Sequence, residues 1–157
     1  MKNIAIRTLQ IAAALIVTQF IFGVAFAAPH ATVIELTQTA CQFIEAENSI
    51  DHGFRSAKKA DCEAINARTG ANRLAQAKVL KLKAGKYIFR VTNKNVPYTL
   101  GFWLRGKGLG RLILASIGGA GLTKGMTKDF IIELKAGEYL YSCPLNPTPD
   151  YRLVVTG

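Results

Sequence analysis

The chain has 157 residues, 50% of them hydrophobic, and its 20 lysines and arginines against 10 acids give a formal net charge of +10. If an N-terminal export signal is removed, the remaining length suits one domain with a substantial core and is too short for two. The basic residues are scattered singly rather than gathered in runs with aromatic residues between them. The charge therefore predicts a solvated basic surface and argues against a nucleic-acid partner.

The first 27 residues have the pattern of a secretory signal. A short basic start precedes an apolar stretch at 9–26, and Ala25-Phe26-Ala27 fits a cleavage site with small residues. We expect cleavage after residue 27, one domain at 28–157 exported to the periplasm or secreted, and no stable membrane insertion afterwards. The alternative is a retained anchor, because the stretch approaches the roughly 20 residues that span a bilayer.

A helical segment interrupts the early strands. Alternating apolar and polar residues predict a first strand at Thr32–Thr39. Residues 45–78 then form a helical insertion, in which Ser56 is a candidate cap for a helix through about Arg68 and Gly70 is a stop signal. Residues 71–78 either extend this helix or form a short second one.

One short motif occurs twice. LKAGKYIF at 82–89 matches LKAGEYLY at 134–141, and in each copy apolar positions with a period of two flank Ala-Gly. Each copy predicts two strands joined by a hairpin-like turn, and two such corners indicate a sandwich. Prolines interrupt the chain after Cys143, and alternation resumes at Tyr151–Thr156 as a closing strand.

Residues 104–128, between the two copies, are rich in glycine. The apolar run Leu112–Ala115 predicts a strand set in glycine-rich loops. The glycines lack the spacing and the following helix of a phosphate-binding loop, so we expect them to act as flexible connections.

The C-terminal part of the chain has a strand with alternating aromatics that ends at Cys143, a short loop after it and a valine-rich last strand. In this it resembles the cupredoxins. The segment Ala-Gly-x-Tyr-x-Phe-x-Val-x-Asn at 84–93 resembles them too. Within this superfamily the chain is most similar to the cupredoxin-like domain of EfeO-type periplasmic iron-uptake proteins, whose early and late cysteines correspond to Cys41 and Cys143. The resemblance covers about the last half of the chain. It implies an all-β Greek-key sandwich with both cysteines at one end.

The sequence departs from these families at the metal ligands. A type 1 copper site uses two imidazoles, one thiolate and a weak axial ligand, usually Met. The upstream loop that would carry the first histidine reads Val96-Pro97-Tyr98-Thr99, and the loop after Cys143 contains neither His nor Met. The acidic residues of the EfeO-type domain are also absent from 100–103. The resemblance thus supports the fold more than a metal site.

The three cysteines carry the remaining chemistry. In an oxidising compartment two of them should pair, either as Cys41–Cys143 or as Cys41–Cys62, and the spacing does not decide between these pairs. The other interpretation is a site for copper, iron or zinc. Its candidate ligands are Cys41, Cys143, His52, Glu45 and Glu47.

Catalysis has little support, because His52 has no adjacent nucleophile and no Ser-His-Asp set can be assembled. We expect a protein that is not an enzyme. The leading hypothesis is an accessory protein that binds or handles copper or iron in the periplasm, with a redox or metal-transport protein as its partner. The alternatives are a disulfide-stapled structural or protein-interaction module without metal, and a small electron-transfer protein.

Overall fold

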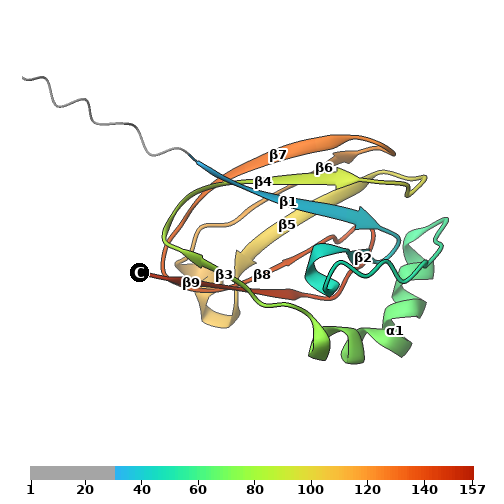
Figure 1. Ribbon diagram of the computed structural model, residues 1–157, viewed down its shortest axis with the longest axis horizontal. Helices are drawn as coiled ribbons and strands as arrows, with labels where there is room; N and C mark the ends of the chain where they lie inside the picture. The colour runs from blue at the N-terminus through green and yellow to red at the C-terminus, as the bar shows by residue number, and fades with distance from the viewer. Residues whose placement is uncertain (1–30) are drawn as a thin grey trace, which may run out of the picture.

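The computed structural model describes residues 31–157, which form two mixed β-sheets packed face to face with α1 outside them (Figure 1). The expected signal at 1–27 lies outside the described residues and stays a prediction. In chain order the elements are β1 (Thr32–Thr39), β2 (Gln42–Phe43), η1 (Glu45–Glu47), α1 (Lys59–Gln76), β3 (Leu80–Lys83), β4 (Gly85–Asn93), β5 (Leu100–Gly106), η2 (Gly108–Leu112), β6 (Ile117–Leu122), β7 (Thr127–Leu134), β8 (Gly137–Ser142) and β9 (Tyr151–Thr156), where η marks a 3₁₀-helix.

The strand order confirms the predicted all-β sandwich with a helical insertion after the early strands. The four-stranded sheet has the order β2-β1-β4-β7, and the five-stranded sheet has the order β3-β9-β8-β5-β6. Both sheets are mixed, because β1 runs parallel to β4 and β3 runs parallel to β9, while the other neighbours are antiparallel.

The core is built from the inward positions of both sheets. In β4 the alternate residues Tyr87, Phe89 and Val91 are buried, as expected for a strand with one face on the core. Phe102 of the opposite sheet packs against Phe89 and Phe130, with ring centroids 5.7 and 5.0 Å apart. Such aromatic contacts across the sandwich fix how the sheets face each other.

The two Ala-Gly corners differ from the hairpins that the sequence predicts. Each corner carries the chain from one sheet to the other: β3 and β4 lie in different sheets, and so do β7 and β8. Gly85 and Gly137 have φ of 154° and 155°, a region that favours glycine. In both copies the tyrosine hydroxyl donates to a lysine carbonyl four residues earlier, Tyr87 to Lys83 at 2.9 Å and Tyr139 to Lys135 at 3.0 Å.

The matched corners give a test of this geometry. Gly85→Ala should lower the free energy of unfolding by about 1–3 kcal/mol through backbone strain. Gly137→Ala should lower it further, because its added Cβ would lie 2.8 Å from Leu114 Cδ1, whereas at Gly85 the nearest atom is 3.9 Å away. Urea denaturation of both variants measures the difference. Equal losses would show that Leu114 moves aside freely.

The helix begins later than predicted and continues past Gly70, as one of the two alternatives for residues 71–78 allowed. It starts at Lys59, where the Asp61 carboxylate accepts the N–H groups of Ala57 and Lys58, while the predicted cap Ser56 instead bonds Tyr98. Gly70 does not stop the helix, which continues to Gln76. Gly70 is buried in α1, and a Cβ added there would have only Asn66 Cβ, at 3.4 Å, within 4 Å.

The glycine-rich region also differs from the prediction. The expected strand at Leu112–Ala115 is replaced by η2 and a turn, while the glycines that were expected to form loops make up β6. Pairing with β5 explains Gly118. A Cβ on Gly118 would lie 2.9 Å from the Phe102 carbonyl oxygen and 3.2 Å from the Trp103 ring.

The sandwich has two distinct ends. The corner end holds Gly85 and Gly137 together with the start of β1, because Thr32 pairs with Tyr87. The loop end holds Cys41 and Cys143, which follow β1 and β8. Figure 1 shows α1 outside the sheets near the end toward which β1 points. Among residues 31–157, none of the helices has the length and apolar character that crossing a membrane requires.

Candidate functional site

The Cys41–Cys62 disulfide ties the loop after β1 to α1 at the loop end. Both cysteines are fully buried, and their Cα atoms lie 5.0 Å apart. Of the two pairs that the sequence left open, this one forms, while Cys143 keeps a free buried thiol and the Cys41–Cys143 bond is absent. The disulfide indicates a location outside the cytoplasm.

Asn146 lies at the centre of the loop end and is fully buried. Its Oδ1 accepts the N–H of Cys41 at 3.0 Å and the hydroxyl of Tyr98 at 3.1 Å. Its Nδ2 donates to the Thr39 carbonyl at 2.9 Å, and its backbone N–H donates to Cys143 Sγ at 3.2 Å. Cys41 and Cys143 therefore both contact one asparagine, which joins the two loops that carry them.

Cys143 is the buried thiol of the loop end, with 1% of its surface exposed. Its Sγ accepts backbone N–H groups from Gly101 at 3.3 Å and from Asn146 at 3.2 Å. Burial raises the pKa of the Cys143 thiol, and the backbone N–H groups offset this only in part. A thiol that stays protonated at neutral pH is a weak nucleophile and a weak metal ligand.

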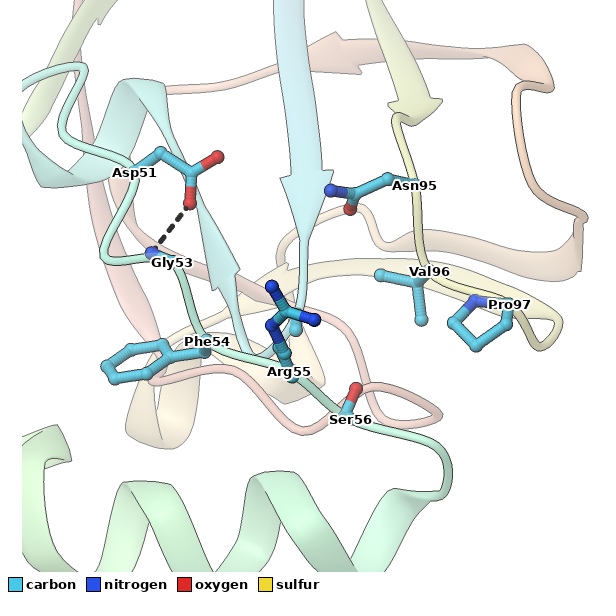
Figure 2. Close-up of a pocket in the computed structure, with 9 residues that line it drawn as sticks. Asp51, Gly53, Phe54, Arg55, Ser56, Asn95, Val96 and Pro97 are labelled. Carbon is cyan, nitrogen blue, oxygen red and sulfur yellow. Dashed lines mark hydrogen bonds between the residues drawn. The ribbon is translucent and has the colours of Figure 1, made fainter.

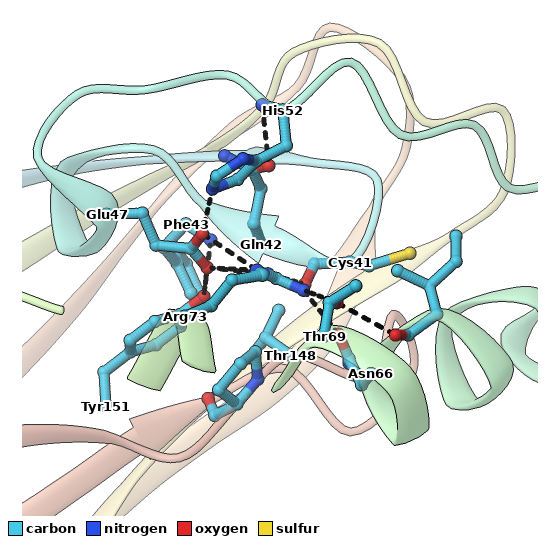
Figure 3. A network of polar contacts seen from close by, with 12 residues as sticks. Cys41, Gln42, Phe43, Glu47, His52, Asn66, Thr69, Arg73, Thr148 and Tyr151 are labelled. Atoms are coloured by element: carbon cyan, nitrogen blue, oxygen red, sulfur yellow. Dashed lines mark hydrogen bonds and ion pairs between the residues drawn. The ribbon is translucent and has the colours of Figure 1, made fainter. Parts of the chain in front are cut away.

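A buried ionic cluster joins η1, α1 and β9 beside the disulfide (Figure 3). Arg73 donates to both carboxylate oxygens of Glu47, from Nη2 to Oε1 at 2.6 Å and from Nε to Oε2 at 2.9 Å. Glu47 also accepts the Tyr151 hydroxyl and lies 2.7 Å from His52 Nε2. Burial by itself raises the pKa of Glu47, but hydrogen bonds from Arg73 and Tyr151 and the nearby positive charge outweigh it and hold that pKa below its ordinary value.

One face of α1 makes these contacts. Cys62, Asn66, Thr69 and Arg73 follow one another at helical spacing and share that face. Asn66 Nδ2 donates to the Pro147 carbonyl at 2.6 Å, and its Oδ1 accepts from Arg73 Nη1 at 2.7 Å. The sequence-based site did not include Arg73. Its spacing from Cys62 is the signal that would have placed it on the buried face.

A polar cavity of about 360 Å³ opens at the loop end beside Ala40. Its walls are the loops 51–56 and 95–97, and Figure 2 shows Arg55 lying between them. Asp51, on the first loop, accepts the N–H of Gly53 at 3.0 Å. Arg55 forms no hydrogen bond or ion pair with any part of the chain that the structure describes, which leaves its guanidinium available to a binding partner.

Four of the five predicted metal ligands are held by a disulfide, a hydrogen bond or ion pairs within the domain. Cys143 is the free thiol, while the others are held as follows: Cys41 in the disulfide, Glu45 by the N–H of Thr37 at 2.7 Å, and Glu47 and His52 in the ionic cluster. Within residues 31–157, no three His, Cys, Asp or Glu side chains gather in a way that could hold a metal ion.

The side chains around Cys143 do not fit a blue copper centre. The loop expected to carry the first histidine presents Tyr98, whose hydroxyl bonds Asn146 and Ser56. The loop after Cys143 presents Asn146, whose carboxamide is already engaged on both sides. That centre needs two imidazoles in addition to its thiolate, and these two positions supply a phenol and an amide.

Comparison with solved structures shows the fold. Auracyanin B matches with a TM-score of 0.51 and 15% identity over 83% of this chain and 93% of that chain. Auracyanin A, a "blue" copper protein from the green thermophilic photosynthetic bacterium Chloroflexus aurantiacus, matches with a TM-score of 0.47 and 14% identity over 81% of this chain and 100% of that chain. Reduced rusticyanin matches with a TM-score of 0.43 and 16% identity over 81% of each chain.

No protein-family model and no curated protein matches the chain. The finer resemblance, to the EfeO-type domain, therefore stays a prediction. The match to auracyanin B, together with the strand order and the place of the helix, shows a cupredoxin-like sandwich.

Proposed function

We propose that this chain is a non-catalytic, disulfide-stapled binding module that works without a metal and presents its loop end to a protein partner. The disulfide supports an extracytoplasmic location, and the predicted signal at 1–27 points to the periplasm or secretion. The module is the second of the functions that the sequence suggested. The geometry favours it over the first, metal handling.

The observation that carries this proposal is the role of Asn146. It makes the contacts that hold Thr39, Cys41, Tyr98 and Cys143 together, so the loops keep their arrangement through protein hydrogen bonds alone. Buried polar groups that are fully paired rigidify the structure around them. A rigid loop end beside a polar cavity with an unpaired Arg55 suits recognition of an acidic segment of another protein.

Metal handling remains the alternative function. It rests on the resemblance to the EfeO-type domain and on the cupredoxin-like fold of the chain. On this chain it would need Cys143 as a thiolate with at least one ligand besides Tyr98 and Asn146. The same requirement applies to electron transfer, which needs a redox metal.

Thiol counting and metal loading separate these functions. In the denatured, unreduced protein we expect one reactive thiol, and in the folded protein we expect that thiol to react far more slowly, because Cys143 is buried and its pKa is raised. After loading with copper(I), iron or zinc and gel filtration, we expect no stoichiometric metal. Retention of one metal ion that is lost in Cys143→Ser would favour metal handling and refute the proposal.

A designed variant provides the positive control for metal loading. Tyr98→His combined with Asn146→His places two imidazoles at the positions that now hold a phenol and an amide beside Cys143. This variant should gain copper binding with a thiolate-to-copper absorption band. A protein that stays folded, as judged by circular dichroism, and binds copper only after these two changes would show that the chain's own ligand set is the limiting feature.

A further inference from the structure

A compact apolar protrusion lies at the corner end, opposite the disulfide. Leu109, Leu112 and Ile113, in and just after η2, are 84%, 82% and 82% exposed. Large aliphatic side chains gathered at this exposure usually mark an interaction site. The site is separate from the loop end of the proposed function, so the two can be tested independently.

The protrusion is a built element rather than a loose loop. The N–H of Lys107 donates to the Glu138 carbonyl at 2.8 Å, and the N–H groups of Ile113 and Leu114 both donate to the Gly110 carbonyl at 3.2 and 2.8 Å. Leu114 packs against the hydrophobic core. The chain therefore turns one leucine inward as an anchor and holds its neighbours outward in fixed positions.

Arg111 and several lysines lie at the same end of the sandwich as the protrusion. Arg111 lies between Leu109 and Leu112 in the sequence. It forms no ion pair within residues 31–157, and its guanidinium lies 5.8 Å from the Trp103 ring centroid. The corner end carries more cations than acids on the elements that meet there. Its lysines and arginine are Lys83, Lys86, Lys107, Arg111 and Lys135, and its side-chain carboxylates are Glu133 and Glu138. Lys107 pairs with Glu138 at 2.7 Å, whereas Lys83 and Lys135, like Arg111, form no ion pair within residues 31–157.

The chain also enters the domain at this end. Thr32 pairs with Tyr87 next to the Gly85 corner, so the residues that follow the apolar stretch 9–26 lead into β1 from the corner end. Figure 1 shows the start of β1 and the C-terminus on the same side of the sandwich. The corner end is therefore the end of the domain at which the chain N-terminal to β1 is attached.

We propose that the protrusion docks the domain on an anionic lipid surface. Exposed aliphatic side chains on a tight turn can enter the boundary between headgroups and acyl chains, while Arg111 and the lysines of the corner end contact lipid phosphates. This is reversible surface binding by a folded domain, and it leaves the loop end facing away from the membrane.

Vesicle sedimentation of the exported, processed protein tests the proposal. We expect binding to vesicles that contain phosphatidylglycerol, weaker binding to phosphatidylcholine alone, and release at high salt. The triple variant Leu109→Ser/Leu112→Ser/Ile113→Ser should weaken binding at least about tenfold, because it removes the apolar side chains that enter the bilayer. Arg111→Glu should weaken binding to the anionic vesicles selectively.

Two variants serve as matched controls. Ile131→Ser removes an isoleucine that is 54% exposed on β7, and Arg68→Glu reverses an exposed charge on α1; neither should change vesicle binding. Circular dichroism and thermal melting confirm that each variant is folded. Equal binding of the triple variant and the unchanged protein would overturn the proposal, and so would a failure of the unchanged protein to bind anionic vesicles.

Self-association is the competing outcome. If the unchanged protein forms a dimer by analytical ultracentrifugation, and the triple variant is a monomer while neither binds vesicles, the protrusion contacts a second copy and the lipid proposal is wrong. Metal loading and thiol counting report on the loop end alone, so their result does not depend on this one.

Discussion

Replacing Arg73 with methionine should lower the free energy of unfolding by about 3–5 kcal/mol, which is the usual effect of leaving one member of a buried ion pair without its partner. The side chains of Arg73 and Glu47 are only 6% and 3% exposed. Methionine fills part of the space but leaves the Glu47 carboxylate with Tyr151 and His52 alone. The variant also removes the bond from Arg73 to the Cys41 carbonyl.

Chemical denaturation measures this loss of stability. A double-mutant cycle separates the interaction between Glu47 and Arg73 from the other effects of each substitution. Glu47→Gln combined with Arg73→Met should be less destabilising than the sum of the single changes, because no charge is then left unpaired. Arg90→Met is the matched control. Arg90 makes a two-bond ion pair with Asp129, but their side chains are 41% and 37% exposed, so its loss should be within about 1 kcal/mol. Equal losses from both arginines would contradict the role of burial.

Acid unfolding is a second readout of the same pair. The pKa of Glu47 is lower in the folded protein than its ordinary value of 4.5. The stability that this ionised carboxylate contributes is therefore fully present above about pH 4.5 and is lost as the pH falls through the folded-state value. In Glu47→Gln this part of the acid dependence should disappear. The variant should lose less stability than the unchanged protein between neutral and acid pH.

The sequence predicts the strands whose signal is local. Thr32–Thr39 and Tyr151–Thr156 alternate apolar and polar residues, and the structure places strands within the same bounds. The strand at Ile117–Leu122 was missed because its glycines argue against a strand, and their use depends on how closely β5 approaches. The corners were recognised as a repeat. Each corner joins two different sheets because its strands pair with strands far away in the sequence. The motif itself carries no information about that pairing.

The candidate site was predicted in part for a similar reason. The resemblance placed Cys41 and Cys143 at one end, and both do contact Asn146 there. The pairing of Cys41 with Cys62 depends on the docked position of α1, which lies in an insertion that the resemblance does not cover. The importance of Asn146 comes from its complete burial between two loops. An isolated asparagine among prolines gives no such signal in a sequence.

Removal of the disulfide is expected to lower the free energy of unfolding by about 3 kcal/mol, since it closes a loop across a sequence separation of 21 residues. The double variant Cys41→Ser/Cys62→Ser should melt roughly 10–15 °C below the oxidised protein. The double change is preferable to a single one because a lone Cys41 or Cys62 could pair with Cys143. Cys143→Ser is the control that keeps the disulfide.

The native fold should survive this change, because two other residues on the same face of α1 also attach the helix to the domain. Arg73 holds Glu47 and the Cys41 carbonyl, and Asn66 holds the Pro147 carbonyl, on the same helix face as Cys62. Cys41 itself has φ of 64°, which is uncommon for a residue with a side chain, and the disulfide is one of the contacts that keep it there. Because Arg73 and Cys62 act on the same loop, Arg73→Met should destabilise the cysteine-free protein by a different amount than the oxidised one. Strict additivity of the two losses would show that the attachments act independently.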